Sequence, residues 1–270
     1  MKEVLCIQDL SCVGKCSLTV ALPVLSAMGC TCSVLPTGVM STHTAFATPH
    51  VHSLTEDILP ISAHWQQIGK RFDAVLVGYL SNTKQIQAVS AVLKENPVIT
   101  ILDPAMADGG KLYSGISPEH PQALKALCPQ AQILLPNVTE ACLLTDIPYQ
   151  ESVDQHYYES LALALLDQGV QSVMLTGVSL TEGQTGFLYA SKNTTPQIYQ
   201  TQQIPGHFHG TGDIFSAVFT GGLLCGLRGF DAGVLAAKFV ERVLTETQTP
   251  TPFGVKFESQ LPWLWEQLSD

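Results

Sequence analysis

The stretch Gly210-Thr211-Gly212-Asp213 leads directly into the apolar run Ile214-Phe215-Ser216-Ala217-Val218-Phe219 and determines how the rest of the sequence is interpreted. Glycines permit a tight loop whose backbone N–H groups turn inward. A helix that begins at this point adds its own free N–H groups and the positive end of its dipole. The stretch therefore predicts a pocket for an anion, and phosphate is the anion that such a pocket suits best.

Asp213 stands at the start of the predicted helix, and the sequence leaves two interpretations of it open. An aspartate at this point can be the N-cap, whose side chain accepts from the first N–H groups of the helix. A carboxylate beside an anion pocket also suits a base that removes the proton from an attacking hydroxyl group. In the second case the glycine loop would stabilise the charge on the phosphoryl group in transit.

A second stretch, Gly14-Lys15-Cys16-Ser17, superficially resembles a P-loop. That motif requires a glycine five positions before Gly14, where Asp9 stands, and Ser or Thr directly after the lysine, where Cys16 stands. We therefore exclude a P-loop. No GxGxxG motif follows the first predicted strand, which disfavours a dinucleotide-binding fold.

Short β-rich runs alternate with helix-like stretches along the whole chain. The candidate strands are residues 4–8, 31–35, 74–78, 98–102, 132–135, 172–176, 186–190 and 197–201. The candidate helices are residues 16–28, 56–70, 84–94, 119–126, 138–144, 156–168, 213–225, 231–246 and 258–268. Most of the first six strands are near-continuous apolar runs, which suit central parallel strands covered on both faces. The order predicts one α/β domain over residues 1–270 with a mainly parallel sheet, in which residues 186–201 form two antiparallel strands near an edge.

The composition restricts the class of protein. Only 13% of the 270 residues are Asp, Glu, Lys or Arg, against a usual share of roughly 25%, and the net charge is −10. A nucleic-acid binder would show a basic patch, so we expect none. Residues 16–55 carry no charged side chain, but Pro and Gly interrupt them and the chain has no apolar run of about 18 residues. With no signal-peptide pattern either, we expect a soluble cytoplasmic protein.

Cysteines and histidines give no strong metal or disulfide signal. The eight cysteines form no CxxC pair and several lie in apolar runs, which favours reduced, buried thiols. The pairs His50-x-His52 and His207-x-His209 lie among Thr, Pro and Gly residues, where loop histidines explain the pattern better than a transition-metal site.

Small, polar and acidic residues follow the predicted strands. In open α/β sheets, ligands bind beyond the carboxyl ends of the strands. The residues that follow the first six strands include Asp9, Ser11, Thr37, Thr44, Tyr79, Ser81, Asp103, Asp108, Asn137, Glu140 and Gly177. Since these ends share one edge of the sheet, we expect a single site there.

Six stretches in this order resemble the ribokinase superfamily and, within it, the pyridoxal (vitamin B6) kinases and the related hydroxymethylpyrimidine kinases. They are Ile7-Gln8, Ser41-Thr42-His43-Thr44, Gly78-Tyr79, Asp103-Pro104 with Asp108, Pro136-Asn137-x-x-Glu140, and Gly210-Thr211-Gly212-Asp213. They span almost the whole chain. The resemblance implies a three-layer α/β/α fold of the ribokinase type.

The resemblance also implies roles on the phosphate side of the site. Asp213 would be the catalytic base, and the amides of Gly210, Thr211 and Gly212 would form the anion hole. Asp103, Asn137, Glu140 and Thr176 would contact the nucleotide, and Asp108 and Glu140 would hold Mg²⁺, partly through water. Simpler explanations stay open: a capping box for Asn137 and Glu140, an Asp-Pro turn for Asp103, and a strand-end hydroxyl for Thr176.

On the acceptor side, Thr44 and Tyr79 match positions that touch the pyridine ring in pyridoxal kinases, and His43 could hold the loop. Asp9 departs from the pattern, because pyridoxal kinases usually have serine there. A carboxylate at this position could accept from the phenol or ring N–H, or favour an amine-bearing vitamer such as pyridoxamine. The segment 10–17 also lacks the usual glycine-rich ending and partly resembles the pyrimidine kinases.

The resemblance therefore implies an enzyme that phosphorylates the 5′-hydroxymethyl group of pyridoxal, pyridoxamine or pyridoxine in pyridoxal 5′-phosphate salvage. ATP and Mg²⁺ would be required, a monovalent cation is a further candidate, and a homodimer is a family expectation. Hydroxymethylpyrimidine kinase of thiamin biosynthesis is the alternative enzyme. A catalytically silent protein that binds B6 or nucleotide is the alternative from another class.

Overall fold

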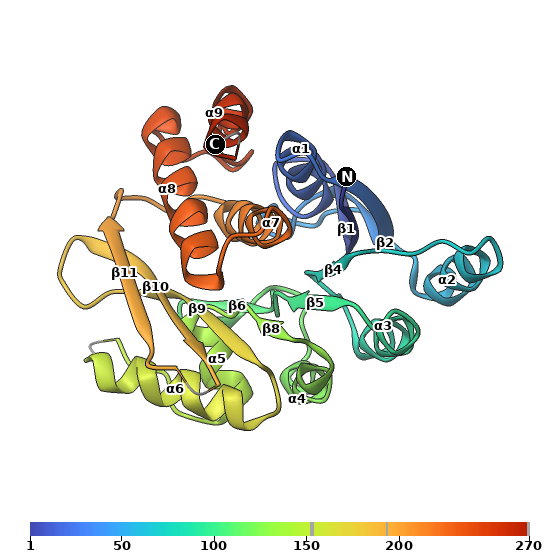
Figure 1. Cartoon of the computed structure of the whole chain (residues 1–270), viewed down its shortest axis with the longest axis horizontal. Helices are drawn as coiled ribbons and strands as arrows, with labels where there is room; N and C mark the ends of the chain where they lie inside the picture. Colours follow the sequence, from blue (N-terminus) through green and yellow to red (C-terminus); the bar gives the residue numbers. More distant parts are fainter. Residues whose placement is uncertain (152–153, 193, 269–270) are drawn as a thin grey trace.

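The computed structural model describes residues 1–151, 154–192 and 194–268, and a single large sheet organises them (Figure 1). Among these residues, nine strands lie in the order β11-β10-β9-β8-β5-β4-β1-β2-β3. Their bounds are β1 Glu3–Val13, β2 Thr31–Thr42, β3 Val51–Ser53, β4 Ala74–Val77, β5 Ile99–Leu102, β8 Ile133–Leu134, β9 Ser172–Val178, β10 Gln184–Ser191 and β11 Gln197–Gln202. A separate hairpin pairs β6 (Ala107–Asp108) with β7 (Lys111–Leu112).

Helices cover both faces of this sheet (Figure 1). One face carries α1 (Leu18–Ala27), α7 (Thr211–Leu224), α8 (Gly229–Thr247) and α9 (Leu261–Gln267). The other carries α2 (Ile58–Gln67), α3 (Thr83–Glu95), α4 (His120–Lys125), α5 (Val138–Thr145) and α6 (Gln155–Asp167). The three-layer α/β/α arrangement predicted from the sequence is confirmed.

Alternation along the central strands explains why both faces are covered. In β1, Val4 and Cys6 pack against the α1 and α7 face, while Leu5 and Ile7 pack against the opposite face. All four side chains are fully buried. A strand that is apolar at every position can satisfy both of its faces only between two layers of helices.

The pairing is parallel through the centre, from β2 through β1, β4, β5 and β8 to β9. The edge strands are antiparallel, since β10 pairs with β9 and with β11, and β3 pairs with β2. This confirms the two antiparallel edge strands expected from residues 186–201. The short strand β3 and the β6–β7 hairpin had no sequence signal that we recognised.

The predicted ends of the first two strands are wrong. We expected loops after residues 8 and 35, but β1 continues to Val13 and β2 to Thr42, with a register shift between Gln8 and Leu10. The polar residues that suggested a loop are satisfied inside the strand, because the Ser11 hydroxyl donates to the Asp9 carboxylate at 3.1 Å. At the carboxyl edge of the sheet, β1 and β2 therefore extend beyond the end of the neighbouring strand β4.

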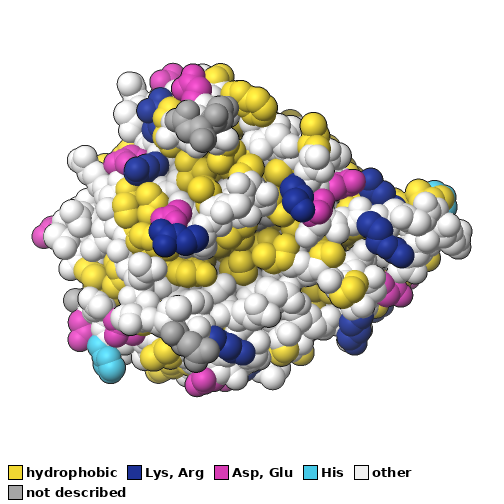
Figure 2. All heavy atoms as spheres, viewed as in Figure 1, with side chains coloured by type: hydrophobic (Ala, Val, Ile, Leu, Met, Phe, Trp, Pro, Cys, Tyr) yellow, Lys and Arg dark blue, Asp and Glu magenta, His cyan; other side chains and the backbone are white. Residues whose placement is uncertain are grey.

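Two of the predicted helices start with a 3₁₀ turn. The predicted helix 56–70 begins as a 3₁₀ turn at Thr55–Asp57 and becomes α2 only at Ile58, and residues 258–268 divide in the same way into Glu258–Gln260 and α9. No helix in the described ranges has both the length and the apolar character needed to span a bilayer. On the face drawn in Figure 2, Lys and Arg side chains are dispersed, several of them beside acidic groups.

His120 of α4 is a buried histidine without a hydrogen-bond partner for either ring nitrogen. Burial lowers its pKa from the ordinary value of 6.5, so the folded state binds fewer protons than the unfolded state. Stability should therefore fall as the pH drops below about 6.5. We predict that His120→Phe flattens the dependence of the melting temperature between about pH 7 and pH 5. His64→Gln, on the exposed face of α2, is the control and should retain the wild-type dependence. Equal slopes for wild type and His120→Phe would contradict this account.

Candidate active site

The start of α7 lies against the loop between β1 and α1. Gly210 is the N-cap, with a left-handed φ of 86°, and a Cβ atom there would overlap the carbonyl oxygen of Lys15. Glycine is therefore required at this position for two independent reasons. Gly212 is exposed, and a Cβ atom built on it would meet nothing within 4 Å. Open space therefore lies beside Gly212 at the helix start, where the N–H groups that precede the first intrahelical bond, from Ile214 to the Gly210 carbonyl, could hold an anion.

Asp213 is in the first turn of α7 and half-buried. The N-cap is Gly210, so the interpretation of Asp213 as the capping residue is wrong. Burial raises the pKa of Asp213 to about 7, with a further contribution from the charge of Asp9 and an opposing one from the backbone N–H of Ser17. A carboxylate with a pKa near the operating pH is suited to accept a proton from a reacting group.

Asp103 follows β5 directly and is buried on the α7 side. Burial, and then the charges of Glu140 and Asp213, hold the pKa of Asp103 well above its ordinary value. The hydroxyl of Ser216, one turn further along α7 than Asp213, interacts with this carboxylate and lowers its pKa. The carboxylates predicted for the phosphate side are therefore close enough to influence one another.

Asn137 and Glu140 form a capping box at the start of α5. The Asn137 side chain accepts from the Glu140 N–H at 3.0 Å, and Glu140 accepts from the Asn137 N–H at 2.9 Å. The simpler explanation weighed for this pair is thus confirmed. The same side chains also hold the segment after β5, because Glu140 accepts from the Met106 N–H at 3.0 Å and Asn137 donates to the Ala107 carbonyl at 2.7 Å. Burial raises the pKa of Glu140 to about 7.

Asp108 and Thr176 lie on either side of this capping box. Asp108 is exposed in the β6–β7 hairpin, and its carboxylate accepts from the Gly109 N–H at 2.8 Å. Thr176, near the end of β9, donates its N–H to the Pro136 carbonyl at 2.9 Å and is bridged to Asn137. Both stay where the sequence placed them, and their nucleotide and metal roles stay predictions.

The acceptor side is organised around Asp9. Its buried carboxylate accepts from Ser17 at 2.6 Å and from Ser11 at 3.1 Å, while burial raises its pKa. Burial and the charge of Asp9 together raise the pKa of Tyr79 to about 12, which places the phenol near this carboxylate. The sequence had given Asp9 and Tyr79 an acceptor role and placed Ser11 at this edge of the sheet. It gave no role to either serine, since hydroxyl residues carry little signal of their own.

His43 holds the loop that carries Thr44. Its Nε2 lies 2.7 Å from the Pro252 carbonyl oxygen, and its ring packs against Phe46 at 4.9 Å and His209 at 5.0 Å between ring centroids. This matches the expectation that His43 positions the loop. The sequence had suggested His209 only as part of a metal-type pair. Nothing in it pointed to Pro252, 209 residues away, as the hydrogen-bond partner of His43.

No lysine or arginine forms an ion pair with the buried carboxylates in the described part of the chain. These carboxylates are Asp9, Asp103, Glu140 and Asp213. Within the same ranges, no group of three or more His, Cys, Asp and Glu side chains could hold a metal ion on its own. The donor set fits a hard cation that takes its remaining ligands from nucleotide phosphates and water, as Mg²⁺ does.

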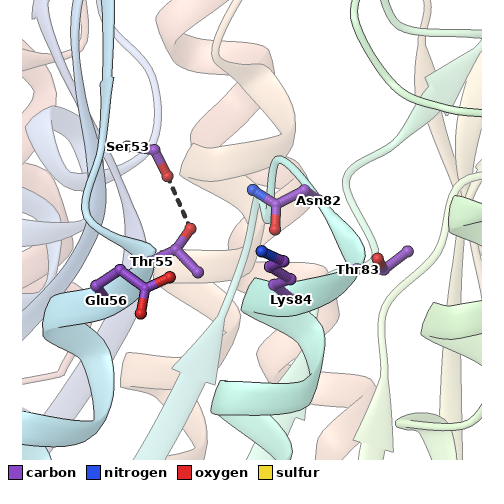
Figure 3. Close-up of a pocket in the computed structure, with 6 residues that line it drawn as sticks. All are labelled: Ser53, Thr55, Glu56, Asn82, Thr83 and Lys84. Carbon is purple, nitrogen blue, oxygen red and sulfur yellow. Dashed lines mark hydrogen bonds between the residues drawn. The ribbon is translucent and has the colours of Figure 1, made fainter.

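A pocket of about 460 Å³ lies between the segment at the end of β3 and the start of α3 (Figure 3). It is lined by Ser53, Thr55, Glu56, Asn82, Thr83 and Lys84. The Ser53 and Thr55 hydroxyls are hydrogen-bonded to each other at 2.7 Å. None of the residues predicted for the site lines this pocket.

The fold and site together define a ribokinase-like kinase, a phosphotransferase with a glycine loop and a carboxylate at the start of α7. Comparisons with known proteins agree. A family model described as phosphomethylpyrimidine kinase matches residues 21–255. The structure of a pyridoxal kinase from Lactobacillus plantarum superposes with a TM-score of 0.92 and 32% identity, and the match covers 99% of this chain and 98% of that one.

Two further comparisons also match proteins named for pyridoxal kinase or phosphomethylpyrimidine kinase. A Bacteroides thetaiotaomicron protein named for phosphomethylpyrimidine kinase, crystallised with pyridoxal, has a TM-score of 0.92 at 29% identity and covers 100% of this chain and 96% of its own. A Schizosaccharomyces pombe protein named for pyridoxal kinase is 31% identical over 68% of this chain, which is 57% of its own length. The chain belongs to the pyridoxal kinase family, within the wider phosphomethylpyrimidine kinase group.

The close approach of Gly210 to Lys15 generates a stability prediction. Gly210→Ala should lower the melting temperature by at least about 5 °C, because the added methyl group meets backbone and the left-handed φ becomes unfavourable. Gly212→Ala is the matched control, since its methyl group enters open space, and should stay within about 2 °C of wild type. Thermal unfolding followed by circular dichroism gives both values. A wild-type melting temperature for Gly210→Ala would show that the helix start does not depend on this contact.

Proposed function

We propose that this chain transfers the γ-phosphoryl group of ATP to the 5′-hydroxymethyl group of a vitamin B6 vitamer, giving the 5′-phosphate and ADP. The observation that carries the proposal is the pairing of Asp213 with the start of α7. A carboxylate whose pKa burial raises to about 7 stands beside a helix N-terminus with open space in front of Gly212. A base and an anion site are thereby held within one turn of helix.

In the proposed step, the hydroxymethyl oxygen forms a bond to the γ-phosphorus while the bond from that phosphorus to the ADP oxygen breaks. Asp213 accepts the proton of the attacking hydroxyl group, and the N–H groups of Gly210, Thr211 and Gly212 stabilise the charge on the phosphoryl oxygens. Holding both reactants at one sheet edge supplies the orientation that an in-line transfer needs.

A bound Mg²⁺ would neutralise the phosphate charges. Asp108 and Glu140 would hold it, partly through water, with Asp103 close by. Asn137 fixes Glu140 through the capping box, and Thr176 stands beside it as a proposed nucleotide contact. A cytoplasmic location, a role in pyridoxal 5′-phosphate salvage, one domain and a homodimer belong to the same proposal. The location and the single domain rest on the sequence pattern, and the salvage role and the homodimer rest on the family resemblance.

For the acceptor, we propose that the ring lies near Tyr79 and Thr44 with Asp9 beneath its polar substituents. The side chain of Tyr79 offers an apolar face to a flat heteroaromatic ring. The buried Asp9 carboxylate can accept from an amine, a phenol or a ring N–H, so pyridoxamine is the vitamer that we expect to be preferred. Hydroxymethylpyrimidine is the competing acceptor, favoured by the phosphomethylpyrimidine kinase match.

We predict that Asp213→Asn lowers kcat by at least about 100-fold and changes the dissociation constant of the nucleotide by less than about threefold. In the wild type, the rate should rise with pH through about 7, because the base acts in its ionised form. Steady-state kinetics and calorimetric titration measure the two quantities.

The matched control is Asp231→Asn, at the third residue of α8 as Asp213 is at the third residue of α7. Asp231 is paired with Arg228 and lies outside the site, so its kcat should equal that of wild type. Near-normal turnover of Asp213→Asn would refute the assignment of the base. A wild type that binds vitamer and nucleotide without turnover would support the silent binding protein instead.

The acceptor proposal predicts the outcome of a turnover panel with pyridoxal, pyridoxine, pyridoxamine and hydroxymethylpyrimidine. The wild type should show its highest kcat/KM with pyridoxamine. Asp9→Ser should lower that value about tenfold relative to pyridoxal, because the amine loses a charged partner. Unchanged preferences in Asp9→Ser would overturn the role of Asp9, and a preference for hydroxymethylpyrimidine would move the chain to the thiamin enzymes.

A further inference from the structure

Ser17 has a backbone conformation that L-residues rarely adopt, with φ 48° and ψ −129°. These angles are close to those of the first central residue of a type II′ turn, where glycine is the usual occupant. Of the four non-glycine residues with positive φ in the described part of the chain, Ser17 alone is buried. Unfavourable backbone conformations persist only where the surrounding structure imposes them, and they concentrate at functional sites.

The Ser17 hydroxyl binds Asp9 and does not cap helix α1. Ser17 is the N-cap of α1, a position at which serine normally caps the helix. Here its side chain makes no capping hydrogen bond and instead donates to the Asp9 carboxylate at 2.6 Å. The helix has therefore lost a cap while Asp9 has gained a short, charge-assisted hydrogen bond.

The carbonyl and the N–H group of Ser17 interact with two different parts of the structure. Its carbonyl accepts from the N–H groups of Val20 and Ala21 at 3.0 and 2.9 Å, which starts α1. Its N–H interacts with the Asp213 carboxylate and opposes the rise in pKa that burial causes there. Because φ sets the direction of the N–H relative to the rest of the residue, an ordinary helical or extended conformation would turn this N–H away from Asp213.

Geometry places this loop against the start of α7, because a Cβ atom on Gly210 would overlap the Lys15 carbonyl oxygen and lie 3.9 Å from the Cys16 Cα. Cys16 also lies close to both carboxylates. Burial raises the pKa of the Cys16 thiol, and the charges of Asp213 and Asp9 raise it further. Segment 10–17 and Asp9 are also the two places where the sequence departs from the pyridoxal kinase pattern. In the structure these two departures are joined by the hydrogen bond from Ser17 to Asp9.

We propose that Ser17 is a positioning residue that connects the acceptor-side carboxylate Asp9 with the base Asp213. Its hydroxyl orients Asp9 for the vitamer, and its N–H orients Asp213 for proton transfer. This inference rests on the proposed function. The Ser17 hydroxyl should affect KM for the vitamer, and the Ser17 N–H should affect kcat. A purely structural role would not separate these two kinetic parameters.

The experiment compares Ser17→Gly with Ser17→Ala. Glycine adopts the left-handed φ without penalty, so the N–H stays on Asp213 while the hydroxyl is lost. We expect KM for the vitamer to rise about tenfold with kcat within about twofold of wild type. Ser17→Ala also loses the hydroxyl, but alanine has the same penalty for a positive φ as serine. Without the hydrogen bond to Asp9 that offsets this penalty, the loop should relax to an ordinary conformation. The N–H of residue 17 would then move away from Asp213. We expect kcat to fall at least about tenfold and the midpoint of its pH profile to move upward.

Ser11→Ala is the matched control. The Ser11 hydroxyl donates to the same Asp9 carboxylate at 3.1 Å, but Ser11 lies within β1 and its N–H is not directed at Asp213. This variant should raise KM for the vitamer and leave kcat and its pH profile unchanged. Equal kcat values and pH profiles for Ser17→Gly and Ser17→Ala would refute the role of the N–H. An unchanged KM in Ser17→Gly would refute the role of the hydroxyl.

The inference can be separated from the proposed function by thermal unfolding. A wild type that turns over no vitamer refutes the proposed function, whatever the variants do. The link between Ser17 and Asp9 is then read from a cycle of Ser17→Gly, Asp9→Ala and the double variant. With Asp9 present, glycine relieves strain but loses a hydrogen bond, so the melting temperature should change little. With Asp9 removed, only the relief remains and the temperature should rise. Additive changes would overturn the link.

Discussion

Four carboxylates meet at the carboxyl edge of the sheet with no lysine or arginine in ion-pair contact within the described ranges: Asp9, Asp103, Glu140 and Asp213. Neutral donors hold them instead. Glu140 accepts from three backbone N–H groups, Asp9 from two serine hydroxyls, and Asp213 from the N–H of Ser17. These donors do not cancel the cost of burial, so the pKa of each carboxylate remains raised. Under the proposed function, a cation that arrives with its phosphate ligands would complete this site, and it would also explain how a chain of net charge −10 could bind a nucleotide.

The geometry of the edge follows from a few close approaches between backbones. Gly210 brings the start of α7 onto the carbonyl of Lys15, which places the helix N-terminus beside the β1–α1 loop. Glu140 and Asn137 tie the segment after β5 to α5, so the phosphate side is fixed by the same residues that cap a helix. His43 joins the β2 end to the Pro252 carbonyl near the C-terminus. Residues far apart in the sequence are thus held to one another by close contacts, while open space remains beside Gly212 at the start of α7.

The sequence allowed the layers, the parallel core and the antiparallel edge to be predicted, because apolar runs and their periodicity report burial directly. The polar strand ends were missed for the opposite reason. Asp9 and Ser11 have the character of loop residues, and the hydrogen bonds that Asp9 accepts from Ser11 and Ser17 make them acceptable inside β1. Asp213 was correctly predicted to lie in the first turn of a helix. Its possible role as the N-cap was wrong, because Gly210, in a left-handed conformation, occupies the N-cap position. Two contacts depend on tertiary structure alone: the hydrogen bond between Ser17 and Asp9, and the packing of His43 on His209. A serine or a histidine in a single sequence does not indicate which distant residue it will contact.

The central claim is that the carboxylate edge requires a divalent cation before it accepts a nucleotide. Calorimetric titration of the purified protein with ADP, once in Mg²⁺ and once in EDTA, tests it most directly. The account predicts that ADP binds at least about tenfold more tightly in Mg²⁺, because the bare phosphates otherwise face uncompensated negative charge. Equal affinity in the two buffers would contradict the account and would require a cationic group of the chain in the site.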